Sequence, residues 1–333
     1  MKKANLVQKV FVFLAAVIIA VVTFVNTPMA ADTFNLKFTT GAAGGIFYMQ
    51  AGVISEIIKK AYPGSQINAV PGGAIGNLGV VSKRVADIGL THINMYPLAL
   101  KGKAPFKQKF ENVSAIMKHG YYSYAQLFVS DKSGIKSFQD LAQKKYPLKI
   151  ATTSRSGASY WMAVWLLDAH GITIDKLESW GGKLLHGSMN DAVNWFRDGQ
   201  VSAWGGGGHL PSNAPTQISQ FTKVRLLSVD KEPLSKLVAD IQGAEARTIP
   251  PGTYPKMVNG NEDVHTFADP GGIIVRKDLP DDVVYKITKA LVENEKTIRE
   301  GAGMEAFDPK TAWKNIGPLH PGAVKYFKER GWM

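Results

Sequence analysis

The sequence contains no cysteine. This absence excludes a disulfide framework, a thiolate metal site and a lipid anchor carried by a cysteine. Common catalytic motifs are also missing, because the chain has no G-x-S-x-G, no H-E-x-x-H and no G-x-x-x-x-G-K-S/T. His186, Ser188 and Asp191 are neighbours in sequence, but nothing selects them as a catalytic triad. We therefore expect a protein that is not an enzyme and that uses no cofactor and no metal.

A long hydrophobic run is absent as well. The apolar stretch 10–25 is shorter than the roughly 18 residues that a membrane-spanning helix needs. Three lysines and no acid precede this stretch, and the small residues Ala30 and Ala31 follow it. This pattern is typical of a signal peptide, so we expect residues 1–31 to be removed near Ala31 and the body to be periplasmic. An uncleaved anchor is the alternative, and it would also place the body outside the cytoplasm.

No run of five basic residues occurs, although the formal net charge is +12. The three lysines of residues 1–31 account for part of this charge, and the other basic side chains are dispersed along the chain. Dispersed charges favour solvated faces over a nucleic-acid interface, so no nucleic-acid partner is expected. The chain beyond residue 31 is long enough for two domains of ordinary size.

The first glycine-rich turn, residues 41–48, lies between an expected strand at 34–38 and a helical pattern that begins near Met49. Such a turn brings backbone close to a ligand and directs the free N–H groups of a helix start at an anion. In the first interpretation, the backbone amides here bind the carboxylate of a ligand, and aromatic side chains cover the apolar part of that ligand. A tight turn with buried aromatic residues is the alternative. The expected ligand-binding residues of this turn are Gly44, Gly45, Ile46, Phe47 and Tyr48.

A second glycine turn follows the expected strand 66–70, and it includes Gly73 and Asn77. Asn77 either contacts the ligand or only caps the helix expected at 77–83. A third strand is expected at 86–90, and His92 follows it as either a pocket residue or a structural histidine. Strands that alternate with helices predict a parallel sheet, whose ligands bind beyond the carboxyl ends of the strands.

The second half of the chain repeats this organisation. A strand at 148–152 precedes a polar turn and a helix expected at 160–170, and a shorter strand at 201–204 ends in four glycines. The arginine of the polar turn suits a carboxylate, because a guanidinium donates two parallel hydrogen bonds. A surface arginine beside helix-capping serines, and a core tryptophan at the strand end, are the alternatives. The candidate ligand-binding residues here are Ser154, Arg155, Ser156, Gly157, Trp204 and Gly205.

Several stretches together resemble the TAXI family, the solute receptors of tripartite ATP-independent periplasmic (TRAP) transporters. They include T-G-A-A-G-G-I-F-Y at 40–48, G-A-I-G-N-L at 73–78, A-D-I-G-L at 86–90 and I-P-P-G-T-Y-P at 249–255. The order of these stretches covers nearly all of the chain after the signal. The Ala42-Ala43 pair and the run of four glycines depart from the family pattern.

The resemblance implies an α/β protein with the type II periplasmic binding fold, in which two α/β lobes close on a small solute without catalysis. The expected lobes are residues 32–122 with 264–333, and residues 123–263. The implied partners are a small carboxylated solute, such as an amino acid or an oxo or organic acid, and the membrane subunits of a TRAP transporter. A periplasmic binding protein that presents its solute to a membrane sensor kinase is the alternative.

Overall fold

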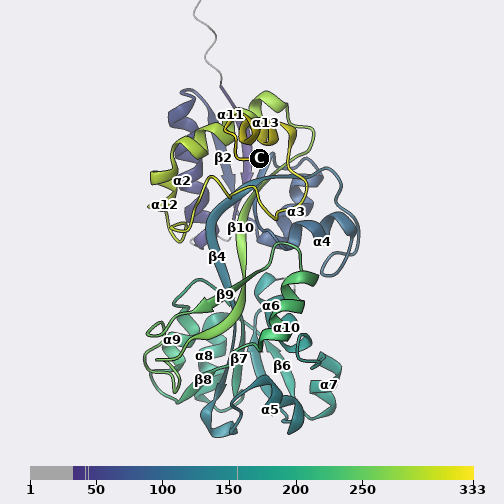
Figure 1. The fold of residues 1–333 in the computed structure, drawn as a ribbon, viewed down its shortest axis with the longest axis vertical. Helices are drawn as coiled ribbons and strands as arrows, with labels where there is room; N and C mark the ends of the chain where they lie inside the picture. The colour runs from purple at the N-terminus through teal and green to yellow at the C-terminus, as the bar shows by residue number, and fades with distance from the viewer. Residues whose placement is uncertain (1–32, 42, 44, 156) are drawn as a thin grey trace, which may run out of the picture.

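The computed structural model describes residues 33–41, 43, 45–155 and 157–333. The expected signal peptide and two expected ligand-binding residues, Gly44 and Ser156, lie outside the described residues. Within the described part of the chain, no helix is long and apolar enough to cross a membrane. The described chain forms an upper and a lower lobe in the view of Figure 1.

The upper lobe is built on a parallel sheet. β1 (Asn35–Thr39) pairs in parallel with β2 (Gln66–Val70) on one side and β3 (Ile88–His92) on the other, which confirms the expected parallel arrangement. Buried and exposed residues alternate along β1, whereas four of the five residues of β3 are buried, as befits an inner strand. The helices of this lobe are α2 (Ile46–Ala61), α3 (Ala74–Ser82), α4 (Met95–Lys101), α11 (Asp281–Glu293), α12 (Glu295–Arg299) and α13 (Pro321–Glu329).

The lower lobe has the same style of construction. β5 (Lys149–Thr152) pairs in parallel with β6 (Lys183–His186) and with β7 (Ala203–Gly208). β8 (Val224–Leu226) and β9 (Glu245–Ile249) extend the sheet. The helical segments here are η1 (Asp131–Ser133), α5 (Phe138–Gln143), α6 (Ala158–Asp168), α7 (Ile174–Ser179), α8 (Met189–Arg197), α9 (Asn213–Ile218) and α10 (Lys231–Asp240).

Two long antiparallel strands, β4 (Ser114–Ser130) and β10 (Val264–Val275), run through both lobes and join them (Figure 1). Their register shifts between Pro270 and Gly272, so their pairing is irregular where they cross between the lobes. Gly120 of β4 has φ +87 at this place, and a Cβ there would collide with the backbone of Phe307. Because both strands belong to both lobes, the expected lobe boundaries inside β4 and before β10 stay a prediction.

The prediction of a strand at 201–204 is wrong in its bounds, because β7 spans Ala203–Gly208 and so includes all four glycines. The reason is close packing between β7 and α6. A Cβ on Gly205 would lie 3.0 Å from the Cβ of Ala163, and one on Gly207 would collide with Met162. The glycine run is therefore the flat surface on which α6 lies, and not a loop at the strand end.

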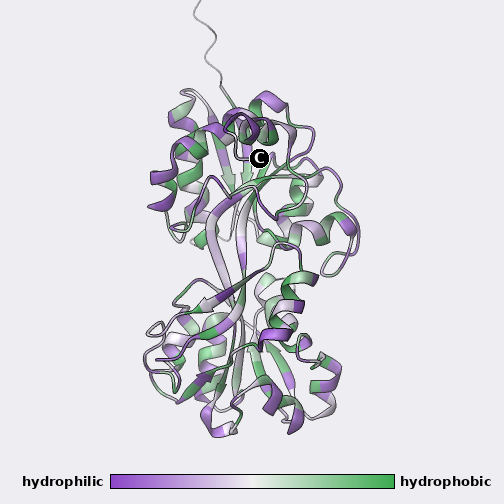
Figure 2. Ribbon diagram, viewed as in Figure 1, coloured by the Kyte–Doolittle hydropathy of each residue, from purple (hydrophilic) through white to green (hydrophobic). Residues whose placement is uncertain are grey.

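Hydrophobic and hydrophilic residues alternate along the helices of both lobes (Figure 2). The upper core joins α2 and α11 to β1 and β3 through residues such as Ile54, Phe38 and Ile287. The lower core contains Leu166 of α6 and other buried residues of that lobe. These two cores hold each lobe together, because buried apolar area is the main favourable term in folding.

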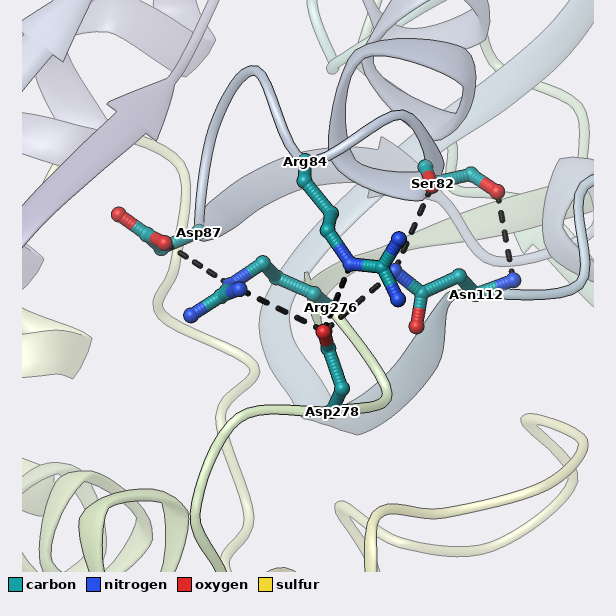
Figure 3. Close-up of polar contacts among 6 residues, drawn as sticks. All are labelled: Ser82, Arg84, Asp87, Asn112, Arg276 and Asp278. Carbon is teal, nitrogen blue, oxygen red and sulfur yellow. Dashed lines mark hydrogen bonds and ion pairs between the residues drawn. The ribbon is translucent and has the colours of Figure 1, made fainter.

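A network of ion pairs lies at the edge of the upper sheet where β3 begins (Figure 3). Arg84 pairs with Asp278 at 2.7 Å, and Arg276 pairs with Asp87 at 2.9 Å and with Asp278 at 3.6 Å. Asn112 adds a hydrogen bond from its Nδ2 to Asp278. This network ties the segment after β10 to the segment before β3.

Candidate functional site

The opposite edge of the upper sheet collects the carboxyl ends of β1, β2 and β3. The first turn leads from β1 to α2, and its helix is capped by Gly45, whose carbonyl accepts hydrogen bonds from Tyr48 and Met49 N–H. Helix starts leave their first N–H groups without intrahelical partners. Ile46 and Phe47 are the first two residues of α2, so their N–H groups have no partner within the helix. Tyr48 keeps 40% of its surface exposed, whereas the Phe47 side chain turns inward and keeps 6%.

Asn77 joins the first two turns to each other. Its Oδ1 accepts hydrogen bonds from Thr39 Oγ1 at 2.8 Å and from Gly73 N–H at 3.0 Å. Its Nδ2 donates to the carbonyls of Thr40 and Leu90, both at 2.7 Å. The side chain is fully buried, so Asn77 positions the turns and has no surface left for a ligand. The helix cap that the sequence offered as the alternative role is wrong, because Asn77 lies inside α3, whose N-cap is Gly73.

A group of rings lies beside the first turn of α2. The ring centroid of Phe47 is 5.1 Å from that of His92, 5.9 Å from that of His119 and 5.5 Å from that of Tyr121. His92 is the last residue of β3 and does not follow the strand as expected, because β3 ends two residues later than the sequence predicted. The side chain of His92 keeps 12% of its surface exposed. Phe47 and His92 therefore form one wall of the junction between the lobes.

Buried polar atoms without partners surround these rings. Asp269 is fully buried on β10, its Oδ1 accepts a hydrogen bond from Asn94 N–H, and its Oδ2 lies 3.5 Å from His92 Nδ1. Within the described residues, the orphaned atoms here are Asp269 Oδ2, His92 Nδ1, both ring nitrogens of His119, both polar atoms of the Asn94 side chain and Gln50 Oε1. Buried polar groups are nearly always hydrogen-bonded, so such a concentration of orphans marks a place where a ligand or water belongs.

Burial controls the charge of this group. It lowers the pKa of His92 to about 4 and the pKa of His119 to about 3. It raises the pKa of Asp269 well above its ordinary value and the pKa of Tyr121 to about 12. Low-dielectric surroundings disfavour the charged form of each group. In the absence of a ligand, these side chains are therefore held in their neutral forms.

The polar turn of the lower lobe lies against the upper lobe. Ala158, the first residue of α6, belongs to the same buried cluster as Leu78 of α3 and Ile93. The turn that precedes it contains Arg155, which is exposed and whose carbonyl accepts a hydrogen bond from Trp161 Nε1. Gly157 is the N-cap of α6 and is partly buried.

Two further expected residues lie away from this junction. Trp204 is 1% exposed and stacks on Phe128 with a centroid distance of 5.4 Å, inside the core of the lower lobe. Gly205 is buried beneath α6, and a Cβ added to it would lie 3.0 Å from the Cβ of Ala163. Both positions are explained by packing, since Trp204 occupies the core position that the sequence left open as the alternative. Ser154 is exposed in the polar turn.

Sequence reasoning missed four residues of the polar group, namely Gln50, Asn94, His119 and Asp269. Asn94 lies just after β3, two residues from the expected His92, and that proximity was the one available signal. His119 and Asp269 lie within long strands in which most residues are buried. Their polar character in such strands is unusual, but only the pairing of β4 with β10 brings them together.

Hollows on the described surface lie elsewhere. One lies between α6 and α10 and is lined by Trp165 and Leu237 among others, and another lies between α2 and α12 beside Val53 and Thr297. Neither contains an orphaned buried polar group, so neither has the polar contacts that fix a small solute. Among the described residues, no group of three or more His, Asp or Glu is arranged to hold a metal ion.

Three solved structures are similar to this chain in the path of the backbone. The TctC solute binding protein from Polaromonas is 14% identical, covers 92% of this chain and 100% of its own, and gives a TM-score of 0.50. The aliphatic sulphonate binding protein SsuA from Escherichia coli is 15% identical (89% of this chain, 84% of that chain, TM-score 0.48). MatC from Rhodopseudomonas palustris, solved with bound malate, is 14% identical (90% and 97%, TM-score 0.47). The first two are named as binding proteins, and the third was solved with malate bound.

The expected α/β periplasmic binding fold is confirmed by the likeness to the TctC protein and by the two lobes. A family model described as the NMT1-like family matches residues 38–331, which is most of the sequence. The chain therefore belongs to the NMT1-like family.

Proposed function

We propose that this protein is a periplasmic solute receptor of the TAXI type. In this role it binds a small carboxylated solute, such as an amino acid or an oxo or organic acid, between its lobes and delivers it to the membrane subunits of a TRAP transporter. Membership of the NMT1-like family and the fold support a solute receptor. The signal-like residues 1–31 support export, and the ordered motifs support the transporter class.

The observation that carries the proposal is the meeting of three helix starts at one junction. Asn77 ties the turns before α2 and α3 together, and Ala158 packs the start of α6 into the buried cluster of α3. The N-terminus of a helix carries partial positive charge and free N–H groups, both of which favour an anion. Three such ends around one junction suit a carboxylate better than a neutral or cationic solute.

Each expected contact has a distinct role in this proposal. The amides of Gly45, Ile46 and Phe47 bind the carboxylate, while the Phe47 ring covers the apolar part of the solute. Arg155 is a permanent cation on an exposed turn, and it reaches the solute from the lower lobe when the lobes close. The orphaned polar atoms around His92 supply the floor of the site.

The strands that join the lobes supply the hinge. β4 and β10 cross between the lobes with a register shift between Pro270 and Gly272, and Gly120 has a positive φ there, so their ladder is irregular at this place. A solute that contacts both lobes stabilises the closed form by its differential affinity for that form. The closed form is then the state that the membrane subunits recognise.

Isothermal titration calorimetry of the chain without residues 1–31 tests the binding step. The probes are succinate, glutarate, 2-oxoglutarate and L-glutamate, with putrescine and glucose as non-anionic controls. We expect at least one carboxylate to bind and the controls not to bind. Binding of no carboxylate in the panel, with binding of a control, would contradict the proposal.

Arg155→Ala tests the contact from the lower lobe. Losing a charge-assisted hydrogen bond should weaken carboxylate binding by about 1–3 kcal/mol. Arg197→Ala is the matched control, since Arg197 lies at the end of α8, where it stacks on Phe221. Equal affinities for the wild type and Arg155→Ala would remove Arg155 from the site.

Delivery needs its own test, because a sensor kinase could use the same receptor. Large membrane permease genes beside the gene would support transport, and a histidine kinase gene alone would support sensing. Uptake of a labelled carboxylate by proteoliposomes that contain the permease, only when this protein is added, would establish delivery.

A further inference from the structure

We propose that Asp269 and His92 act as a proton-sharing pair that anchors the solute's carboxylate. When the carboxylate docks beside the first turn of α2, the proton held by Asp269 moves to His92, and the resulting imidazolium binds the solute. His92 is then a solute contact and Asp269 a positioning residue that acts through it. This inference rests on the proposed binding of a carboxylated solute and names the cation that the upper lobe contributes.

The structure places the two groups close together, with no other hydrogen-bond partner among the described residues for either facing atom. Asp269 Oδ2 lies 3.5 Å from His92 Nδ1, and Asp269 Oδ1 is held by Asn94 N–H at 3.2 Å. Nδ1 is the buried ring nitrogen of His92, so the exposed part of the ring is the opposite edge, which carries Nε2. The ring centroid of Phe47, the second residue of α2, lies 5.1 Å from that of His92. The exposed edge of His92 therefore lies beside the helix start that is expected to bind the carboxylate.

The charged groups near Asp269 are already paired with one another. The carboxylate that acts on Asp269 is Glu245 of β9, which is already paired with Lys118 at 2.8 Å and with Arg247 at 2.7 Å. The remaining titratable neighbours are His119 and Tyr121 of β4, and α2 contributes the neutral side chains of Phe47 and Gln50. Among the described residues, no lysine or arginine forms an ion pair with Asp269.

Without solute, burial favours the neutral forms, with the proton on Asp269 and an unprotonated nitrogen on His92. An anion beside Nε2 reverses this preference, because an opposite charge within a few ångströms stabilises the protonated imidazole. The proton leaves the carboxyl oxygen and binds a ring nitrogen, so no proton is exchanged with solvent and the total charge of the pair is unchanged. Nδ1–H then donates to the Asp269 carboxylate, and Nε2–H donates to the solute.

The test is nitrogen NMR of the protein with ¹⁵N-labelled histidine, at about pH 7.5, without and with saturating succinate, glutarate, 2-oxoglutarate or L-glutamate. We expect the His92 signals to change from one protonated and one unprotonated nitrogen to two protonated nitrogens when a carboxylate binds. In Asp269→Asn, which holds no transferable acid proton, His92 should stay neutral and the affinity should fall about tenfold. His92→Gln cannot become a cation, so it should lose affinity to a similar extent.

His170 is the matched internal control. It is also a buried histidine near an acid, with Nε2 3.7 Å from Asp230 Oδ2, but it lies in the lower lobe and stacks on Phe138. Its signals should not move when the solute binds, and His170→Gln should bind the solute with unchanged affinity.

Binding of a carboxylate while His92 stays neutral would overturn the pair and leave the proposed receptor function standing. Wild-type affinity in both Asp269→Asn and His92→Gln would do the same. Binding of none of the four carboxylates would overturn the receptor function and this inference together. Circular dichroism of both variants identifies any loss of affinity that comes from unfolding.

Discussion

The two ends of strand β3 have opposite designs. Just before the strand, a chain of ion pairs at the protein surface joins Asp87, Arg276, Asp278 and Arg84 (Figure 3). At its last residue, His92, the neighbouring polar groups are buried and lack partners. Five residues of one strand thus separate charges that are paired near water from groups that are neutral and unpaired inside.

The difference separates stability from binding. A buried polar atom without a partner costs free energy, whereas a paired surface charge contributes little in either direction. At the first end each charged side chain has an ion-pair partner of opposite sign, so its residues are explained by the fold. The second end is complete only when something donates or accepts hydrogen bonds there, which is the expected property of a binding site.

Asn77 is the exception to this comparison, because it lies at the binding end of β3 and yet its side chain is fully hydrogen-bonded. Asn77→Ala removes its hydrogen bonds to Gly73, Thr39, Thr40 and Leu90. Because these partners are left unsatisfied, we expect the free energy of unfolding to fall by about 3 kcal/mol. Urea denaturation measures this change. A loss below about 1 kcal/mol would mean that water replaces Asn77 and that the turns are not tied as described.

A change of pH from 7.5 to 5 should lower the stability contributed by the binding end of β3 and leave that of the paired end unchanged. Burial lowers the pKa of His119 to about 3, so between about pH 6.5 and 3 the unfolded chain binds a proton that the folded protein does not. Stability from neutral His119 is therefore complete above pH 6.5 and is lost as the pH falls, by about 2 kcal/mol at pH 5. His119→Gln should lose that much less stability between pH 7.5 and pH 5, as measured by urea denaturation at both values.

Asp278 provides the control for the pH experiment. Its hydrogen bond with Arg84 lowers its pKa, so its contribution is present above the ordinary carboxyl pKa and is lost only as the pH falls below it. Asp278→Asn should leave the difference between pH 7.5 and pH 5 unchanged. A pH response in this variant equal to that of His119→Gln would show that the two ends do not differ as described.

Breaking the paired end should have the smallest effect. Arg276→Gln removes ion pairs with Asp87 and Asp278 that are about a quarter to two fifths exposed, so we expect a loss of about 1 kcal/mol. Arg84→Gln, at a side chain that is 61% exposed, should change the free energy of unfolding by less than about 0.5 kcal/mol. Neither variant should alter carboxylate affinity, and a loss of affinity in Arg276→Gln would couple the two ends.

Much of the fold follows from local patterns in the sequence. The strand expected at 66–70 has the observed bounds, because turn residues enclose it. Helix starts at glycine turns were also expected, although α2 and α3 begin about three residues earlier than their apolar periodicity indicated. The strand expected at 201–204 ends too early, because glycine predicts a turn unless a helix packs against it.

The candidate site was predictable only in part. Phe47 lies in the helix after β1 and His92 is the last residue of β3, near the strand ends where a parallel sheet places its ligands, so the sequence directed attention to them. Asn77 and Trp204 are as polar or aromatic as a ligand contact, and only their burial and partners assign them to positioning and packing. Sequence patterns report what kind of residue stands at a position, but not which surface it faces.

By itself, the sequence determined the alternation of strands and helices, the glycine turns and the absence of known catalytic motifs, since these depend on neighbours along the chain. Only the tertiary structure decided which polar groups come together. His119 of β4 and Asp269 of β10 meet beside His92 because two antiparallel strands cross between the lobes next to β3. Contacts between residues so distant in sequence depend on strand order and register, which no local pattern records.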